Sequence, residues 1–303
     1  MNYGKEYDMG HMEKGEAENA GSEKNEATLH PRQEAETLGV RSNLLVARGV
    51  SEIDAYSDRI VLRMPNEPHY WGGNMTTFRG GHVDPEKQVA QFRADFPEAA
   101  HVAISWDVFD MQIGPEHEQL SAMGFELEQL DILSLTAPLK RSPIPEGIVV
   151  RPVESDADWQ QVIALQVETG VEQGYERNSY EIYLRSRFAS RRRQISEGWA
   201  IWLGAFDGDI LAADLGVYTD QIVARFQEVE TRPSYRRRGI CAALVTAGVD
   251  WAKSKAPNAV PVLQALSDGP AGRIYRRCGF EHCETQVVAM LPPEGTFERP
   301  EDA

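Results

Sequence analysis

Runs of periodic and alternating apolar residues divide the chain from residue 38 onward into two successive sets of helices and strands. In the first set these patterns predict a strand at 60–62, a helix at 85–96, a strand at 101–106, a helix at 116–123 and a strand at 130–136. Prolines at positions 138, 143 and 145 then interrupt any regular element. We therefore expect the two sets to meet at residues 140–147.

The second set has a clearer pattern. It predicts a strand at 148–151, helices at 156–171 and 178–191, strands at 199–206, 210–218 and 221–231, a helix from about 240, a strand at 260–266, a helix at 271–277 and a strand at 286–291. The helix that starts near Ile240 has apolar residues 3, 4, 7 and 11 positions later, which forms one apolar stripe. The three strands before it are separated by short turns and indicate an antiparallel meander.

The two ends of the chain differ from these sets. Residues 1–36 contain many Glu, Gly, Asn and Lys residues and few large apolar ones, so they cannot bury enough surface to offset the entropy of ordering. We expect a disordered acidic tail at 1–36, a first unit at 37–140, a second unit at 147–292 and a short tail at 293–303.

Charge and composition narrow the classes of function. The 47 acidic and 31 basic residues give a net charge of −16, which repels nucleic-acid phosphates and attracts cations such as amines. No stretch approaches the ~18 consecutive apolar residues of a membrane helix. The three cysteines form no CxxC pair, and the seven histidines are scattered without ligand spacing. We expect a cytoplasmic protein without a metal, a nucleic-acid partner or a membrane segment.

One loop has the pattern of an anion site. The predicted strand that ends at Thr231 is followed by a loop with three consecutive arginines, Arg236, Arg237 and Arg238, then by Gly239 and the amphipathic helix. The free backbone N–H groups of a first helical turn bind anions, and a glycine allows the ligand to approach the backbone closely. In an acidic chain, a basic loop of this kind favours a polyanionic ligand such as a pyrophosphate.

This segment resembles the coenzyme-binding motif of the GNAT acetyltransferases, Arg/Gln-x-x-Gly-x-Gly/Ala, read here from Arg236 to Cys241. A second family motif, Ala-x-x-x-Tyr-x-x-x-Gly-Phe, is matched from Ala271 through Tyr275 to Phe280. The resemblance covers roughly residues 148–291. The chain departs from the family pattern at Cys241, where a small residue is usual, and at Asp268, where Asn is frequent.

The resemblance implies acetyl-CoA as co-substrate and an amine acceptor, with direct attack of the amine on the thioester in a ternary complex. The strand edge before the loop would pair with the pantetheine arm, and a backbone N–H there would polarise the thioester carbonyl. The loop and the first helical turn would hold the pyrophosphate. The coenzyme-contacting residues implied in this way are Val229, Glu230, Thr231, Arg236, Arg237, Arg238, Gly239, Ile240, Cys241, Ala242 and Asp268.

Three residues are the candidates for the chemistry. Tyr275, in the family's general-acid position, would protonate the leaving thiolate of coenzyme A. Glu228 or Glu230 would accept the proton of the ammonium group, directly or through water, or anchor a cationic substrate. The two carboxylates share one strand face by period-2 alternation unless a bulge re-aims one of them. Glu172 and Glu176 are weaker candidate anchors at a helix end.

The first unit contains a weaker copy of the second motif. Leu120 to Phe125 aligns with Tyr275 to Phe280, although Leu120 replaces the tyrosine and no arginine and glycine loop precedes it. The expected fold is therefore α/β (α+β), with two tandem GNAT-like units, each a mixed, mostly antiparallel sheet flanked by helices. An aromatic stretch at 69–74 of the first unit could close over the acceptor site through Tyr70 and Trp71.

Some alternatives stay open from the sequence. The leading function is an N-acetyltransferase, and the other is a non-catalytic acyl-CoA binding or regulatory module. The acceptor, the length of the acyl group and a homodimer are not encoded in any pattern that we can identify. Cys241, beside arginines at a helix start, is either a reactive thiol or a small packed side chain.

Overall fold

The computed structural model describes residues 35–68, 70–267 and 269–293. The expected tails lie outside the described residues, apart from residues 35, 36 and 293, and so does Asp268. None of the helices in these described ranges is both long and apolar enough to cross a lipid bilayer.

The first half contains three α-helices and five strands within the described ranges. In chain order they are α1 (Leu38–Val46), β1 (Glu52–Ala55), β2 (Arg59–Arg63), the short 3-10 helix η2 (Trp71–Gly73), β3 (Met75–Arg79), α2 (Pro85–Asp95), β4 (Val102–Asp107), α3 (Pro115–Ala122) and β5 (Glu126–Ser134).

The second half follows the predicted order of elements. Its elements are β6 (Ile148–Pro152), α4 (Asp156–Glu172), α5 (Arg177–Ser196), β7 (Ala200–Asp207), β8 (Ile210–Thr219), β9 (Val223–Thr231), η3 (Pro233–Tyr235), α6 (Ile240–Lys255), β10 (Val260–Leu266), α7 (Pro270–Cys278) and β11 (Glu281–Leu291).

All of these strands form one continuous sheet of eleven, in the order β1-β2-β3-β4-β11-β5-β10-β9-β8-β7-β6. Only the β3–β4 and β9–β10 pairs are parallel, and the other neighbours are antiparallel. The prediction of a mixed, mostly antiparallel sheet flanked by helices is therefore confirmed.

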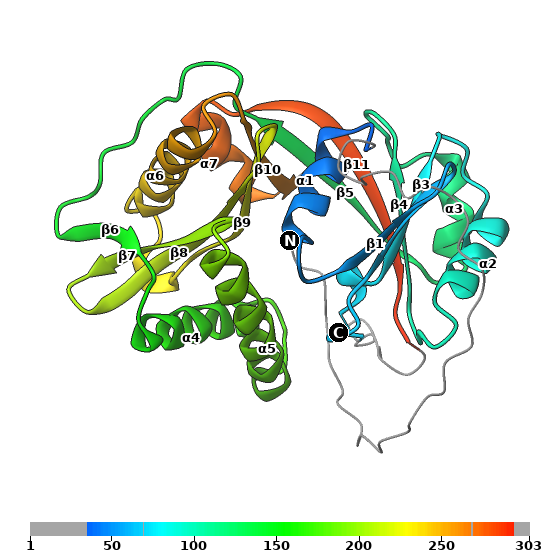
Figure 1. The fold of residues 1–303 in the computed structure, drawn as a ribbon, viewed down its shortest axis with the longest axis horizontal. Helices are drawn as coiled ribbons and strands as arrows, with labels where there is room; N and C mark the ends of the chain where they lie inside the picture. Colours follow the sequence, from blue (N-terminus) through cyan, green and yellow to red (C-terminus); the bar gives the residue numbers. More distant parts are fainter. Residues whose placement is uncertain (1–34, 69, 268, 294–303) are drawn as a thin grey trace, which may run out of the picture.

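The last strands of the two halves are exchanged. β5, from the first half, pairs with β10 on one side and with β11 on the other. β11, from the second half, pairs with β5 and then with β4 of the first half. Figure 1 shows β5 and β11 side by side at the centre of the molecule. Each half thus contributes the strand that completes the sheet of the other.

The weak internal repeat has a structural counterpart at this exchange. Gly124 follows α3 and Gly279 follows α7, and both have positive φ, at 92° and 102°. Only glycine adopts this backbone region without steric cost, so each helix ends there and the exchanged strand begins. The next residues, Phe125 and Phe280, are both buried.

Helices cover the two faces of the sheet. Around the C-terminal strands, α6 and α7 pack on one face, while α4 and α5 pack on the other (Figure 1). α1 crosses the middle of the sheet and contacts β9 and β10. α2 and α3 cover the N-terminal strands in a separate apolar core.

The pattern prediction missed some elements and shortened others. α1, β1 and β3 were not predicted, and β5 and β11 begin earlier than the expected residues 130 and 286. The first residues of both strands are largely polar, as in Glu281 to Gln286, and these polar residues obscure the apolar alternation. These residues adopt strand conformation because β5 and β11 each pair with a neighbouring strand on both sides.

Candidate active site

The candidate site lies where two parallel strands separate. β9 and β10 are paired only from Val223 to Arg225 and from Val260 to Val262. β9 then continues to Thr231 and β10 to Leu266 without pairing to each other. The backbone groups of the inner edge of β9 are therefore available beyond Arg225. The corresponding parallel pair of the first half, β3 and β4, stays paired from Thr76 to Arg79 and has no such opening.

A bulge in β9 lies beside this opening. Asp214 of β8 faces Glu230, but Gly216 faces Gln227, so β9 has one more residue than β8 between these pairs. Glu228 takes up the irregularity with a φ of 50°, a left-handed conformation that is rare for a residue other than glycine. Simple alternation predicts that Glu228 and Glu230 lie on the same face of the strand. The bulge between them breaks this alternation.

The arginine and glycine loop leads directly into α6. Gly239 is the N-cap of α6 with a φ of 81°, and a Cβ built on it would meet no atom within 4 Å. The first-turn N–H groups of Ile240, Cys241 and Ala242 have no carbonyl acceptor within the helix. Arg236 donates to the Thr231 carbonyl at 3.1 Å. The loop is thus open at the end of α6 that carries a partial positive charge.

Of the three loop arginines, only Arg236 forms an ion pair within the described residues, with Glu172 at 2.6 Å. Arg237 has a φ of 64° and is exposed. Arg238 is also exposed and lies 4.9 Å from the ring centre of Tyr235. These two side chains extend the positive charge of the loop into solvent. Glu172, one of the weaker candidate anchors, is therefore a partner of the loop.

The opening contains a cavity of about 330 Å³. All three candidate catalytic residues, Tyr275, Glu228 and Glu230, line this cavity, together with Val229 in the bulge. These residues come from α7 and β9, so the tertiary structure brings the second motif next to the strand that precedes the arginine and glycine loop. The remaining predicted coenzyme contacts, from Arg236 to Ala242, lie along the chain just after β9.

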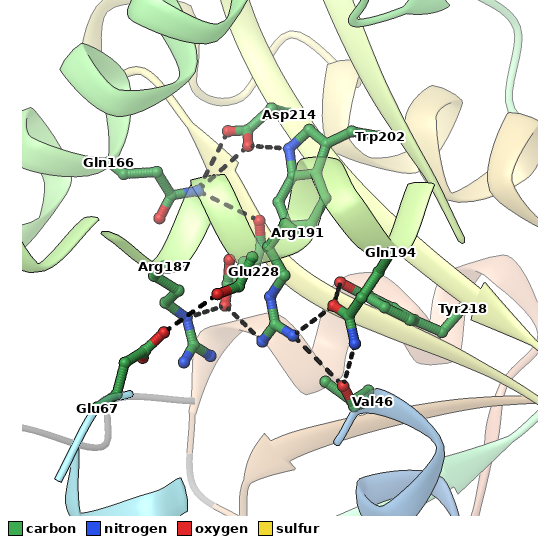
Figure 2. A network of polar contacts seen from close by, with 11 residues as sticks. Val46, Glu67, Gln166, Arg187, Arg191, Gln194, Trp202, Asp214, Tyr218 and Glu228 are labelled. Atoms are coloured by element: carbon green, nitrogen blue, oxygen red, sulfur yellow. Dashed lines mark hydrogen bonds and ion pairs between the residues drawn. The ribbon is translucent and has the colours of Figure 1, made fainter. Parts of the chain in front are cut away.

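Glu228 is held in a buried ion-pair network (Figure 2). Its Oε1 accepts from Arg187 Nε at 2.6 Å and lies 3.5 Å from an Arg191 terminal nitrogen. Arg191 also donates to Gln194, which accepts a further hydrogen bond from the Tyr218 hydroxyl. Burial acts to raise the pKa of Glu228, but the two guanidinium groups outweigh it and lower that pKa. Glu228 is therefore a carboxylate that resists protonation.

The pKa of Glu230 shifts in the opposite direction to that of Glu228. It is half-buried in the cavity wall, and burial raises its pKa above the usual value while nearby Arg236 only partly opposes this. Its cross-strand partner Asp214 is fully buried and accepts hydrogen bonds from Trp202 Nε1 at 2.7 Å and from Gln166 Nε2 at 3.2 Å. Burial also raises the pKa of Asp214. Of the two carboxylates on β9, Glu230 is thus the one whose pKa is raised.

Tyr275 lies on α7 with only 5% of its surface exposed. Burial, followed by the proximity of Cys241 and Glu230, raises the pKa of its hydroxyl well above 10. The hydroxyl forms no hydrogen bond to another described residue, although the side chain lines the cavity. Tyr275 is therefore protonated at neutral pH and has a proton to donate.

Cys241 is not a reactive thiolate. Burial, together with the neighbouring Cys278 and Glu230, raises the pKa of its thiol to about 12. The side chain packs against the apolar core beneath α6. The pattern argument for a lowered pKa failed because the thiol packs against the core and loses its hydration.

Pattern reasoning missed most of the cavity wall. Four tyrosine rings follow one another around it, with centroid distances of 4.3 Å between Tyr175 and Tyr180, 5.9 Å between Tyr180 and Tyr183, and 5.7 Å between Tyr183 and Tyr70. We call these four residues the tyrosine wall. Glu128 of β5 also lines the cavity. The only sequence signal was the close spacing of the aromatics at 175–183.

The aromatic stretch of the first unit is divided between two roles. Tyr70 belongs to the tyrosine wall, whereas Trp71 stacks on His101, with ring centres 6.0 Å apart, inside the first half. Glu176, the other weak candidate anchor, is the N-cap of α5 and accepts from the backbone N–H groups of Asn178 and Ser179. Glu176 therefore caps α5, the helix that carries Tyr180 and Tyr183 of the tyrosine wall.

Comparison with known proteins finds a family model that matches part of the chain. Residues 161–280 match the model of the acetyltransferase (GNAT) family. A functionally unknown conserved protein from Staphylococcus epidermidis ATCC 12228 has a similar fold, with a TM-score of 0.61, 12% identity, and coverage of 80% of this chain and 94% of that chain. No curated protein matches the chain.

Two further solved structures share the fold. A GCN5-related N-acetyltransferase from Kribbella flavida has a TM-score of 0.58, 17% identity, and coverage of 84% of this chain and 97% of that chain. A tandem GNAT protein from the clavulanic acid biosynthesis pathway has a TM-score of 0.52, 14% identity, and coverage of 86% and 89%. Residues 161–280 therefore match the GNAT acetyltransferase family model, and the chain shares the fold of these solved structures, which include a tandem GNAT protein.

Proposed function

We propose that this protein is an N-acetyltransferase that transfers the acetyl group of acetyl-CoA to an amine acceptor by direct attack in a ternary complex. The observation that carries the proposal is the cavity between β9 and β10, because Tyr275, Glu230 and the bulged backbone of β9 all border it. Acetyl-CoA is the co-substrate of the family whose model matches residues 161–280.

In this proposal the coenzyme binds along the edge of β9 and over the start of α6. The backbone of Val229, Glu230 and Thr231 pairs with the amides of the pantetheine arm. The residues from Arg236 to Ala242 bind the pyrophosphate through their backbone N–H groups and positive charge. The fit is supported by the open space at Gly239, where a side chain would otherwise reach toward the phosphates.

The chemical step needs one polarised carbonyl and two proton transfers. Glu230 accepts a proton from the acceptor ammonium, directly or through water. The neutral amine attacks the thioester carbon, whose oxygen is polarised by a backbone N–H at the bulge near Val229. The new C–N bond forms as the C–S bond breaks, and Tyr275 donates its proton to the leaving thiolate. Glu228 does not serve as the base, because Arg187 and Arg191 keep it ionised and engaged.

Calorimetric titration with acetyl-CoA tests the coenzyme site. We expect wild type to bind and Gly239→Glu to lose binding, because the new carboxylate occupies the phosphate position. Gly198→Glu is the matched control, since Gly198 has the same φ of 81°, an equally open Cβ position and a location after α5, away from the loop. Both variants carry the same backbone strain, so only the difference between them reports on the site.

Release of free thiol with an amine acceptor tests turnover. Acceptor-dependent thiol release by wild type is the expected result. Binding of acetyl-CoA without thiol release toward any primary amine would instead favour a non-catalytic acyl-CoA binding module. Absence of binding by wild type would contradict the proposal entirely.

A further inference from the structure

A line of buried polar side chains connects α4 to the bulge of β9, and the proposed chemical step does not use it (Figure 2). It runs from Trp202 on β7 through Asp214 on β8 to Gln166 on α4, and it ends at the backbone carbonyl of Glu228. Trp202 and Asp214 are completely buried, and Gln166 is 4% exposed. Apolar side chains would fill this space at a lower desolvation cost, so the line indicates a role beyond packing.

Each hydrogen bond in this line has a defined direction. The indole N–H of Trp202 can only donate, so Asp214 Oδ2, 2.7 Å away, accepts from it. The Nε2 atom of Gln166 lies 3.2 Å from the same Oδ2 and 3.3 Å from Oδ1. Gln166 therefore turns its NH2 group, and not its amide oxygen, toward Asp214. Nε2 also donates to the carbonyl oxygen of Glu228 at 3.4 Å, so this one NH2 group joins β8 to β9.

Glu228 has a backbone conformation that needs support. Its φ of 50° lies in the left-handed region, which residues other than glycine adopt only where their surroundings fix them. Two helices supply this support, because Arg187 of α5 pairs with the side chain at 2.6 Å and Gln166 of α4 donates to the carbonyl. The register with β8 passes from Gln227 to Glu230 and skips the two residues between them. The β8 ladder therefore does not position the Glu228 peptide by itself.

The Glu228 carbonyl and the Val229 N–H belong to one peptide group. This group is trans and planar, so the C=O and N–H bonds point in opposite directions. A carbonyl held toward Gln166 on α4 thus directs the Val229 N–H away from α4. Val229 lines the cavity, and the proposed function uses an N–H at this point of the bulge to polarise the thioester. The direction of that N–H depends on Gln166.

We propose that Gln166 is a positioning residue that, held by Asp214 and Trp202, orients the Glu228–Val229 peptide so that its N–H polarises the thioester carbonyl of acetyl-CoA. This inference rests on the proposed acetyl transfer and assigns what holds its hydrogen-bond donor in place. A preorganised donor stabilises the negative charge that develops on the oxygen, because it does not have to reorient during the reaction. Asp214 keeps the Gln166 amide from turning over, so the donor has its direction before the coenzyme binds.

The direct test observes the thioester carbonyl itself. Infrared difference spectra are recorded for free and bound acetyl-CoA that is isotopically labelled at the acetyl carbonyl carbon. A hydrogen bond to this oxygen weakens the C=O bond, so we expect a lower stretching frequency in the wild-type complex. Gln166→Met keeps an unbranched side chain of similar length but has no donor. In this variant we expect the band to move back toward the frequency of free acetyl-CoA, with acetyl-CoA affinity by calorimetry unchanged.

Steady-state kinetics separates positioning from contact with the acceptor. Thiol release is measured with acetyl-CoA and benzylamine, a primary amine with one aromatic ring. We expect Gln166→Met to lower kcat by about tenfold, less than complete removal of an oxyanion-hole donor, and to leave KM for benzylamine unchanged. A raised KM with an unchanged carbonyl band would show that Gln166, which lines the cavity, acts by contacting the acceptor, and would overturn the positioning role.

Gln161→Met is the matched control. Gln161 lies on the same helix and also bonds to the backbone at the start of β8, donating to the Asp209 carbonyl and accepting from the Leu211 N–H, both at 2.9 Å. It does not line the cavity, so this variant should keep the wild-type band and kcat. If Gln166→Met fails to fold, Gln166→Asn gives the same readout. Its amide is set back by one methylene, about 1.5 Å, and no longer reaches the Glu228 carbonyl.

The outcomes distinguish this inference from the proposed function. An unchanged band and an unchanged kcat in the folded Gln166 variant would overturn the positioning role and leave acetyl transfer intact. A wild-type band at the frequency of free acetyl-CoA would also overturn it, since no donor would then polarise the carbonyl. If wild type does not use benzylamine, the infrared comparison decides alone, because it needs no acceptor. No binding of acetyl-CoA by wild type would contradict the proposed function, and this inference would fail with it.

Discussion

Glu228 and Glu230 are two residues apart in the chain, yet their pKa values shift in opposite directions. Burial acts to raise both, but Glu228 faces Arg187 and Arg191 across short distances, whereas Arg236 and a hydrogen bond with Thr169 do not outweigh burial at Glu230. The bulge sends the two side chains into these different surroundings. Carboxylates on one strand can therefore have separate roles, one structural and one chemical.

Glu228→Gln should destabilise the protein. The change leaves two buried guanidinium groups without their carboxylate, which costs about 3–5 kcal/mol for a broken buried ion pair. Because the folded-state pKa of Glu228 is lowered, its contribution to stability is present above the ordinary value of 4.5 and is lost as the pH falls through the lowered pKa. Denaturant unfolding of wild type and variant between pH 7 and pH 3 measures this difference, which should shrink toward acid pH.

Glu230→Gln should abolish the pH dependence of kcat/KM and should not lower the free energy of unfolding near neutral pH. The base is active only when ionised, so kcat/KM of wild type should rise with pH through the raised pKa of Glu230 and then level off. A raised carboxylate pKa also means that ionisation disfavours the folded state as the pH rises. Steady-state rates from pH 5 to pH 9 check the first point, and a pH profile unchanged by the substitution would rule out Glu230 as the base.

Tyr275→Phe should lower kcat by about 10²-fold or more, because a general acid contributes at least this much to proton transfer. Acetyl-CoA affinity should stay within about twofold, since the phenyl ring still fills the core position of Tyr275. Thiol-release kinetics and calorimetry together separate the two effects. A parallel loss of affinity and rate would indicate a structural role for the ring.

At the scale of elements, the site depends on where strands and helices end. The opening exists because β9 and β10 stop pairing after Arg225 and Val262, and the loop proposed to bind the pyrophosphate is followed by Gly239, which starts α6 in a left-handed conformation. The tyrosine wall depends on the start of α5, where the Glu176 carboxylate accepts from the N–H groups of Asn178 and Ser179. Such caps orient the first helical turn.

Glu176→Ala should therefore weaken acceptor binding without affecting acetyl-CoA. Loss of the cap loosens the first turn of α5, which carries Tyr180 and follows Tyr175, so KM for the acceptor should rise while coenzyme affinity stays constant. Glu181→Ala is the control, because Glu181 lies on the same helix, is partly exposed and does not line the cavity, and its ion pair among the described residues is with Arg185. If both variants behave alike, the cap does not organise the wall.

At the scale of the whole molecule, the two halves complete each other. Removing the first half would take β5 from between β10 and β11, and removing the second half would take β11 from between β5 and β4. One exchanged strand also borders the candidate site, since Glu128 and Leu130 of β5 line the cavity.

Separate fragments 35–140 and 141–293 should each fail to form a stable monomer. Each lacks one internal strand, which exposes unpaired backbone groups and apolar side chains. Co-expression of the two fragments should restore both the sheet and acetyl-CoA binding. Circular dichroism, size-exclusion chromatography and calorimetry measure these outcomes. A folded, coenzyme-binding fragment 141–293 would show that the exchange is not required for the fold.

Local sequence patterns determined most of the secondary structure of this protein. Apolar periodicity predicted the helices from α2 to α7, and short apolar runs predicted most of the strands, because helix and strand periods are properties of neighbouring residues. The Gly239 loop and the Tyr275 motif were also readable, since each needs particular residues at fixed short spacing. The mixed, mostly antiparallel fold follows from the order of these elements.

Only the tertiary structure decided how the two halves combine and which residues meet in the cavity. The exchange of β5 and β11 joins strands about 150 residues apart, as in the pairing of Asp131 with Thr285, and no local pattern encodes such a pairing. The opposite pKa shifts of Glu228 and Glu230 arise from a bulge and from arginines on another helix. Burial and long-range charge depend on the packed fold. They set the pKa values of residues that the sequence identifies only as candidates.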